Sequence, residues 1–128
     1  MIKTDVSVGE FVDKLTILEI KCERISAPEK LMNIRKELSL MRQLWHESEY
    51  SQADIAEESS KLKAINETLW VIEDDIREQE LAQCFDQEFI RLARSVYVTN
   101  DKRAEIKKRI NMKLGSGLVE EKSYKKYC

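Results

Sequence analysis

Hydrophobic residues recur along most of this chain at spacings of three and four, a pattern typical of amphipathic helices. Ser7-Val8-Gly9-Glu10 has the form of a capping box and predicts the start of a first helix. The apolar seam of that helix consists of Val8, Phe11, Leu15, Leu18, Cys22 and Ile25. Because proline is well tolerated in the first turn of a helix, Pro28 predicts where a second helix begins.

A polar segment, residues 48–54, follows the second helix, whose apolar face ends at Met41 and Trp45. A third helix is predicted from about residue 52 to about residue 81, with a seven-residue repeat of Leu62, Ile65, Leu69, Ile72 and Ile76. At 1.5 Å per residue this helix is about 45 Å long, whereas a compact chain of this size is roughly 36 Å across. We therefore expect an elongated fold, or a helix that projects into a dimer.

The segment from Phe85 to Val96 predicts a fourth helix, and its broad apolar face indicates that this is the most buried one. Thr99-Asn100-Asp101 places three good cap or turn residues in a row, which predicts a break. A fifth helix then runs from about residue 101 to 114 and ends at Gly115. The expected fold is all-α, with four to five helices in an elongated bundle and a C-terminal basic helical hairpin.

The composition agrees with this fold, since three Gly and one Pro in 128 residues are too few for the turns of a β protein. We expect one helical domain, 1–128, in which 116–128 form a polar tail. The chain has no apolar run long enough for a membrane span or signal peptide, so a cytoplasmic protein is expected. Cys22 and Cys84 are predicted to be core residues, Cys128 to be exposed, and His46 to lie on the surface.

Charge is distributed unevenly along the chain. The net charge is −2 overall, yet residues 1–90 carry −9 and residues 91–113 carry +6. Such asymmetry suggests either an acidic partner for the basic segment or pairing within the molecule. The acidic remainder would repel a polyanion, and no aromatic residue between Lys102 and Lys113 offers stacking, so nucleic acid is not the expected ligand.

The basic segment offers a candidate anion site. Arginines and free N–H groups at a helix start both bind phosphate or carboxylate groups. The candidate ligand-binding residues are Arg91, Arg94, Tyr97, Asn100, Asp101, Arg103 and Lys107. The alternative is that these cations pair with Glu and Asp residues of the first three helices.

Carboxylates on the helices raise a second possibility. Glu10-x-x-Asp13 is similar to the magnesium-binding motifs of all-helical nucleotide pyrophosphatases, and Glu73 with Asp74 offers further ligands. No convincing second motif of this kind follows, so no metal cofactor is expected and magnesium is the alternative. One side of the third helix is lined by Asn66, Trp70, Glu73 and Arg77. Glu73 and Arg77 are spaced as an i,i+4 ion pair, which is enough to explain their presence.

Five segments of the chain have a familiar form: VSVGEFVDKLTILEIK (6–21), IRKEL (34–38), LWVIEDDIR (69–77), LARSVYVTNDKRAEIKKRIN (92–111) and SGLVEEKSY (116–124). Through these segments, nearly the whole chain resembles a small uncharacterised family found in bacteria and their phages. The resemblance brings no activity to any residue. It makes the segment from Arg94 to Lys107 the centre of the family's motif.

The sequence thus favours a non-catalytic binding or accessory module whose basic helical hairpin engages an acidic partner or a phosphate-bearing ligand. A magnesium-dependent enzyme acting on a nucleotide or another phosphorylated metabolite is the alternative, and a purely structural protein is a third possibility. The long third helix and the heptad-like seams favour a homodimer.

Overall fold

The computed structural model describes residues 1–117 and 121–127, and its regular structure there is entirely helical. Four helices follow one another along the chain: α1 (Val8–Arg24), α2 (Pro28–Glu47), α3 (Ala56–Leu81) and α4 (Gln87–Leu114). The predicted all-α fold is therefore confirmed. None of these helices combines the length and the apolar character needed to cross a membrane.

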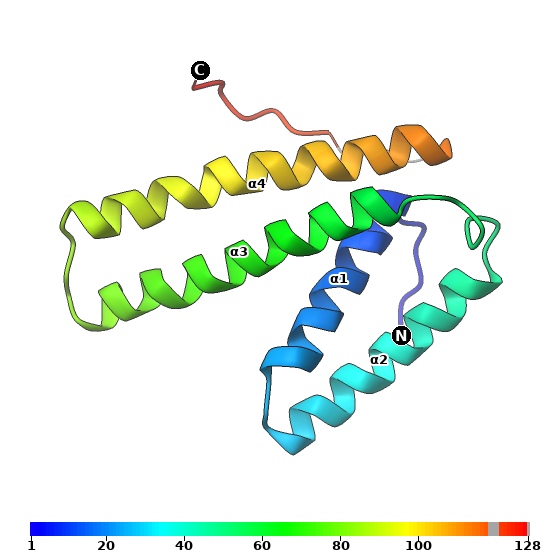
Figure 1. Ribbon diagram of the computed structural model, residues 1–128, viewed down its shortest axis with the longest axis horizontal. Helices are drawn as coiled ribbons and strands as arrows, with labels where there is room; N and C mark the ends of the chain where they lie inside the picture. The colour runs from blue at the N-terminus through cyan, green and yellow to red at the C-terminus, as the bar shows by residue number, and fades with distance from the viewer. Residues whose placement is uncertain (118–120, 128) are drawn as a thin grey trace.

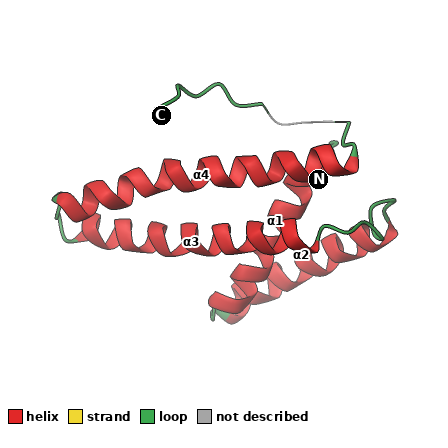
Figure 2. Cartoon of the chain, turned by 45° about the horizontal axis from the view of Figure 1, so that its top comes forward, coloured by secondary structure: helices red, strands yellow, loops and turns green. Residues whose placement is uncertain are grey.

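The two long helices, α3 and α4, lie side by side as an antiparallel hairpin (Figures 1 and 2). Helix α1 starts beside the C-terminal end of α4 and crosses the hairpin, and α2 packs mainly on α1. The far half of the hairpin extends beyond this crossing without a third helix on it (Figure 1). The accessible surface of 9440 Å² exceeds the roughly 7,000 Å² of a compact protein of this mass, as an elongated shape requires.

The local signals at most helix ends are confirmed. The Ser7 hydroxyl accepts a hydrogen bond from the Glu10 N–H at 3.2 Å, and Pro28 is the first residue of α2. Gly115 ends α4 in the left-handed region, with φ 63°. The second half of the capping box is absent, because the Glu10 carboxylate accepts from Lys107 instead of turning back to Ser7.

The predicted break at Thr99-Asn100-Asp101 is wrong, because α4 passes through all three residues as one helix of 28 residues. Thr99 is buried, and Leu92 and Ile106 are buried seven residues before and after it on the same face of α4. Continuous packing on this face outweighs the turn preference of Asn and Asp. The basic residues therefore lie along a single helix, and the hairpin consists of α3 and α4.

The segment from Phe85 to Val96 is also not the most buried part of the fold. Phe85 and Ile90 are about half exposed, and Leu92 is the only fully buried apolar residue of this segment. Cys84, predicted to be a core residue, is exposed in the connection between α3 and α4, whereas Cys22 is half-buried beside α2. Both errors have one cause: no other helix in the described part of the chain covers the far half of the hairpin.

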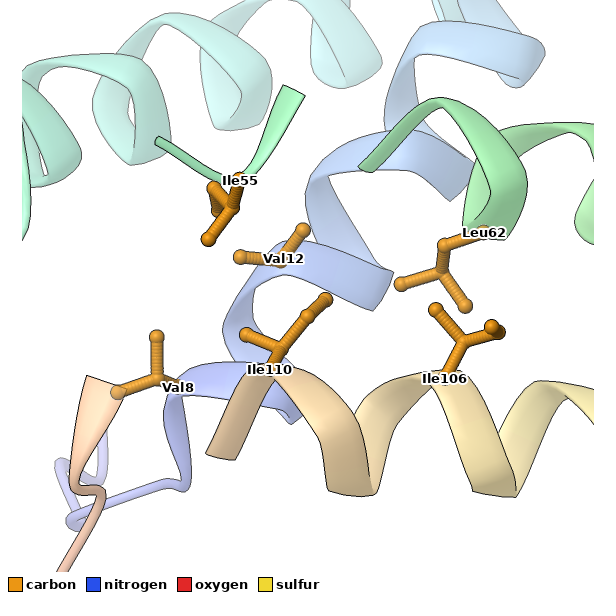
Figure 3. Packing of buried hydrophobic residues seen from close by; sticks show 6 residues of the cluster. All are labelled: Val8, Val12, Ile55, Leu62, Ile106 and Ile110. Carbon is orange, nitrogen blue, oxygen red and sulfur yellow. The ribbon is translucent and has the colours of Figure 1, made fainter. Parts of the chain in front are cut away.

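The core lies where α1 crosses the hairpin. Its main cluster consists of Val8, Val12, Ile55, Leu62, Ile106 and Ile110, which converge from α1, α4, α3 and the segment before α3 (Figure 3). A second cluster, Leu18, Leu38 and Met41, joins α1 to α2. The two clusters hold all the helices together through α1.

Gly9 lets α1 approach α4 closely. A Cβ at this position would overlap the backbone carbonyl oxygen of Lys107 and would lie 3.0 Å from Oδ1 of Asn111. Because a helix backbone cannot yield as a side chain can, any larger residue at position 9 must push the two helices apart.

We therefore expect Gly9→Ala to destabilise the protein by about 1–3 kcal/mol, the usual effect of overpacking. This corresponds to a melting temperature lower by roughly 4–12 °C for a domain of this size, measured by thermal denaturation. Gly117→Ala is the matched control, since a Cβ there meets nothing within 4 Å. A melting temperature for Gly9→Ala equal to that of the control would contradict the close approach.

Candidate anion-binding site

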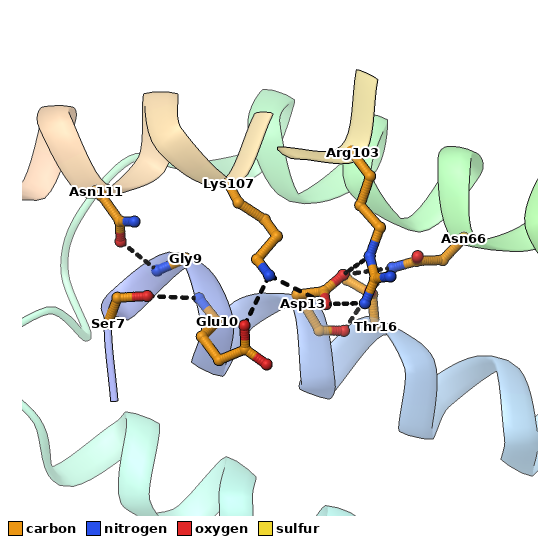
Figure 4. Close-up of polar contacts among 9 residues, drawn as sticks. All are labelled: Ser7, Gly9, Glu10, Asp13, Thr16, Asn66, Arg103, Lys107 and Asn111. Carbon is orange, nitrogen blue, oxygen red and sulfur yellow. Dashed lines mark hydrogen bonds and ion pairs between the residues drawn. The ribbon is translucent and has the colours of Figure 1, made fainter. Parts of the chain in front are cut away.

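The crossing of α1 and α4 contains a buried charged network centred on Asp13 (Figure 4). Asp13 is 1% exposed, and its Oδ1 accepts hydrogen bonds from Arg103 Nε at 3.0 Å and from Asn66 Nδ2 at 2.8 Å. A second N–H of Arg103 donates to Oδ2, which makes the pair bidentate. Such a pair is the strong form of an arginine–carboxylate contact.

Further polar contacts hold the same crossing on either side of Asp13. Asn66 Nδ2 also donates to the Thr16 hydroxyl at 2.9 Å, and that hydroxyl donates to the Asp13 carbonyl oxygen at 2.7 Å. Lys107 Nζ donates to Glu10 Oε2 at 2.6 Å and lies 3.9 Å from Asp13 Oδ2. The buried positive charges of α4 are thus neutralised by carboxylates of α1.

The first turn of α1 receives its caps from the end of α4. The Gly9 N–H donates to Asn111 Oδ1 at 2.7 Å, and the Val8 N–H donates to the Ser116 hydroxyl at 3.3 Å. With the Ser7 cap on Glu10, three of the N–H groups that a helix start leaves without partners are satisfied by side chains. These contacts fix the position of α1 on α4.

Two of the predicted ligand residues, Arg103 and Lys107, therefore belong to this network, as the alternative of internal pairing proposed. Arg91 lies far from them and pairs with Glu88 at 2.5 Å. The Arg91 guanidinium, through this hydrogen bond, lowers the pKa of the Glu88 carboxyl below its usual value. Arg94 is exposed, and no carboxylate of the described residues lies within ion-pair distance of it.

The other predicted residues line a cleft between α4 and the C-terminal tail, which runs back along α4 (Figure 1). This tail cleft has a volume of about 730 Å³. Its lining consists of Tyr97, Asn100, Asp101 and Arg103 from α4 and Lys122, Tyr124, Lys125 and Tyr127 from the tail. Four of the seven predicted residues are therefore brought together, and the tail adds cations and aromatic rings.

Ring contacts join the two sides of the tail cleft. The rings of Tyr97 and Tyr127 meet edge to face with centroids 5.3 Å apart. Within the tail, Lys122 Nζ lies 5.4 Å from the centroid of the Tyr124 ring. Asp13 neutralises Arg103, and the other charged residues that line the cleft are Lys122, Lys125 and Asp101. A concave site of this size with lysines in its lining fits a small anion.

A second cavity, of about 510 Å³, lies in the corner between α1 and the hairpin. This corner cavity is lined by Ile17, Ile20, Asn66, Leu69, Trp70, Glu73, Asp74, Arg77, Asn100 and Arg103. The polar stripe of the third helix found in the sequence thus faces one cavity. Asn100 and Arg103 line both the corner cavity and the tail cleft.

The carboxylates considered for magnesium are arranged differently. Glu10 and Asp13 face Lys107 and Arg103, while Glu73 pairs with Arg77 at 3.5 Å. Among residues 1–117 and 121–127, no three His, Cys, Asp or Glu side chains form a group suited to a metal ion. Positive side chains thus contact Glu10, Asp13 and Glu73, three of the four carboxylates that a divalent cation would need.

The sequence matches the model of a family described as a family of unknown function (DUF6165) over residues 2–127. The chain belongs to this family. No curated protein and no solved structure matches it. The resemblance to an uncharacterised family is thus confirmed.

Sequence reasoning missed the polar partners in the crossing. Asn66 was noted for its place on the third helix, but Thr16, Asn111 and Ser116 were not singled out. One signal was available, since Gly9 in the first turn of a helix indicates a close helix approach, which buried polar side chains then have to bridge. Lys122 and Lys125 carried no signal, because lysines in a polar tail are common.

The network predicts a large difference between two neighbouring acidic residues. Asp13→Asn leaves the charges of Arg103 and Lys107 without their buried partner and is expected to cost about 3–5 kcal/mol. Thermal denaturation would then show a melting temperature lower by roughly 12–20 °C.

Glu10→Gln is the matched control for this variant. Its side chain is 48% exposed, so we expect an effect below about 1 kcal/mol. If both variants melted at the same temperature, Asp13 would not be the centre of the crossing.

Proposed function

We propose that this protein is a non-catalytic binding module that holds a phosphate-bearing ligand in the tail cleft. The observation that carries the proposal is the meeting of Tyr97, Asn100 and Asp101 with the lysines and tyrosines of the tail around one cavity. Ammonium and phenol groups are donors suited to phosphate oxygens. The hollow shape supports a small ligand over a flat acidic protein surface.

The electrostatics of α4 support the same proposal. Arg94 and Lys102 are exposed, and no carboxylate of the described residues pairs with either of them. They add positive potential along the helix that forms one wall of the tail cleft, and such a potential raises the local concentration of anions. We also propose that the protein is cytoplasmic, as its sequence leads us to expect.

A magnesium-dependent enzyme is the weaker proposal. Asp13 has its oxygens engaged by Arg103 and Asn66, and Glu10 is engaged by Lys107. Binding of a metal at these carboxylates would require the contacts that hold α1 on α4 to open, at a large cost in stability.

We also propose that the module works as a homodimer through the far half of the hairpin. Val71, Leu81, Phe85 and Ile90 are between 44% and 87% exposed there. The T-shaped contact of Phe85 with Phe89, at 5.1 Å, leaves much of the Phe85 ring in solvent. Two helices with an uncovered apolar side usually bury it against another layer.

The anion site is tested by calorimetric titration with pyrophosphate. We expect the wild-type protein to bind, with an affinity that falls as salt is added, because the attraction is between exposed charges. Lys125→Ala should weaken binding by about fivefold to tenfold, the loss of roughly 1–1.4 kcal/mol from one contact to a charged group.

Lys36→Ala on α2 is the matched control for this titration. Lys36 is also exposed, has no ion-pair partner among the described residues, and lies outside the tail cleft. Its affinity for pyrophosphate should equal that of the wild type. Absence of binding by the wild type, or equal losses in both lysine variants, would contradict the proposed site.

The dimer is tested by light scattering during size exclusion. Leu81→Glu places a charge on the far half of the hairpin and is expected to shift the mass from a dimer to about 15.0 kDa. Leu40→Glu, at a leucine of α2 that is 59% exposed, should leave the dimer intact. A wild-type protein that is monomeric at all concentrations would reject the proposal.

A further inference from the structure

The corner cavity contains three groups with unused capacity for hydrogen bonding. Asn66 is 6% exposed, and its amide nitrogen donates to Asp13 and Thr16. Its carbonyl oxygen accepts no hydrogen bond from a described residue. This oxygen therefore has an acceptor position that a ligand donor can use.

The other two groups are the amide of Asn100 and the indole of Trp70. The Asn100 side chain makes no hydrogen bond within the described part of the chain, and neither does the Trp70 indole N–H. Trp70 is half-buried and, unlike Trp45, it stacks on no aromatic ring of the described residues. Its indole lines the corner cavity, where a planar or ring-shaped ligand would contact it.

The apolar and charged residues of the corner cavity narrow the ligand class. Ile17, Ile20 and Leu69 provide an apolar surface beside the Trp70 ring. Because Asp13 already neutralises Arg103, the remaining charges, Glu73, Asp74 and Arg77, give no positive excess. A phosphate group is therefore disfavoured here, whereas an uncharged ring with hydroxyl, N–H or carbonyl groups matches both amides.

We propose that the corner cavity binds the uncharged ring of a phosphorylated compound, a sugar or a nucleobase, whose phosphate lies in the tail cleft. This inference rests on the proposed function of the cleft. Asn100 and Arg103 line both spaces, so the two cavities adjoin at these residues. Trp70 then stacks on the ring, and Asn66 accepts a hydrogen bond from it.

Tryptophan fluorescence tests the inference. The chain has two tryptophans, so Trp45→Phe leaves Trp70 as the only reporter. Uridine 5′-monophosphate, ribose 5-phosphate and pyrophosphate are titrated into this variant, with calorimetry in parallel. We expect at least one ring-bearing phosphate to change the emission of Trp70 and pyrophosphate to bind without changing it. A change in emission with uridine 5′-monophosphate alone would indicate that the base is the ring bound, whereas a change with ribose 5-phosphate as well would indicate the sugar.

Trp70→Ala provides the decisive comparison. It should weaken binding of the ring-bearing phosphate roughly tenfold or more, as loss of an aromatic stack does, and leave pyrophosphate affinity within about twofold. Lys125→Ala should weaken both. Equal effects of Trp70→Ala on both ligands would overturn the ring site while the phosphate site stands. Failure of pyrophosphate to bind the wild type would overturn both proposals.

Discussion

The fold depends on one close contact, the crossing of α1 over α4 at Gly9 and Asp13. Gly9 lets the two backbones approach, and Asp13 then reaches Arg103 from a position with almost no access to water. Both hydrophobic clusters involve α1, so an error in this crossing would displace α2 and the hairpin together. A buried ion pair adds little net stability, but loss of one partner is costly, because the other charge is left buried without compensation.

The same contact arranges the two candidate binding spaces. Arg103 is directed toward α1 by Asp13, and Asn66 is held by the same carboxylate. Two residues that border the corner cavity are therefore fixed before any ligand arrives, which lowers the entropy lost on binding. The tail cleft is built differently, since one of its walls is a segment without regular structure.

The sequence predicted the features that depend on neighbouring residues. Ser7, Pro28 and Gly115 mark helix ends through local hydrogen bonding or backbone preference, and each occupies its predicted position. The turn preference of residues 99–101 gave a wrong break because packing of α4 on α3 decides that region. Tyr97, Asn100 and Asp101 were grouped around that predicted break, whereas in the structure they lie together because α4 is continuous. The position of the tail residues beside them depends on the tertiary fold, which no local sequence pattern encodes.

The caps on α1 affect how the protein folds while it is being synthesised. The Gly9 and Val8 N–H groups find their partners 102 and 108 residues later in the chain, at Asn111 and Ser116. During synthesis, α1 and α2 can pair early, but the first turn of α1 stays without these caps until the end of α4 has left the ribosome. The main hydrophobic core therefore closes only after α4 has been synthesised, and the nascent N-terminal half exposes its apolar face until then.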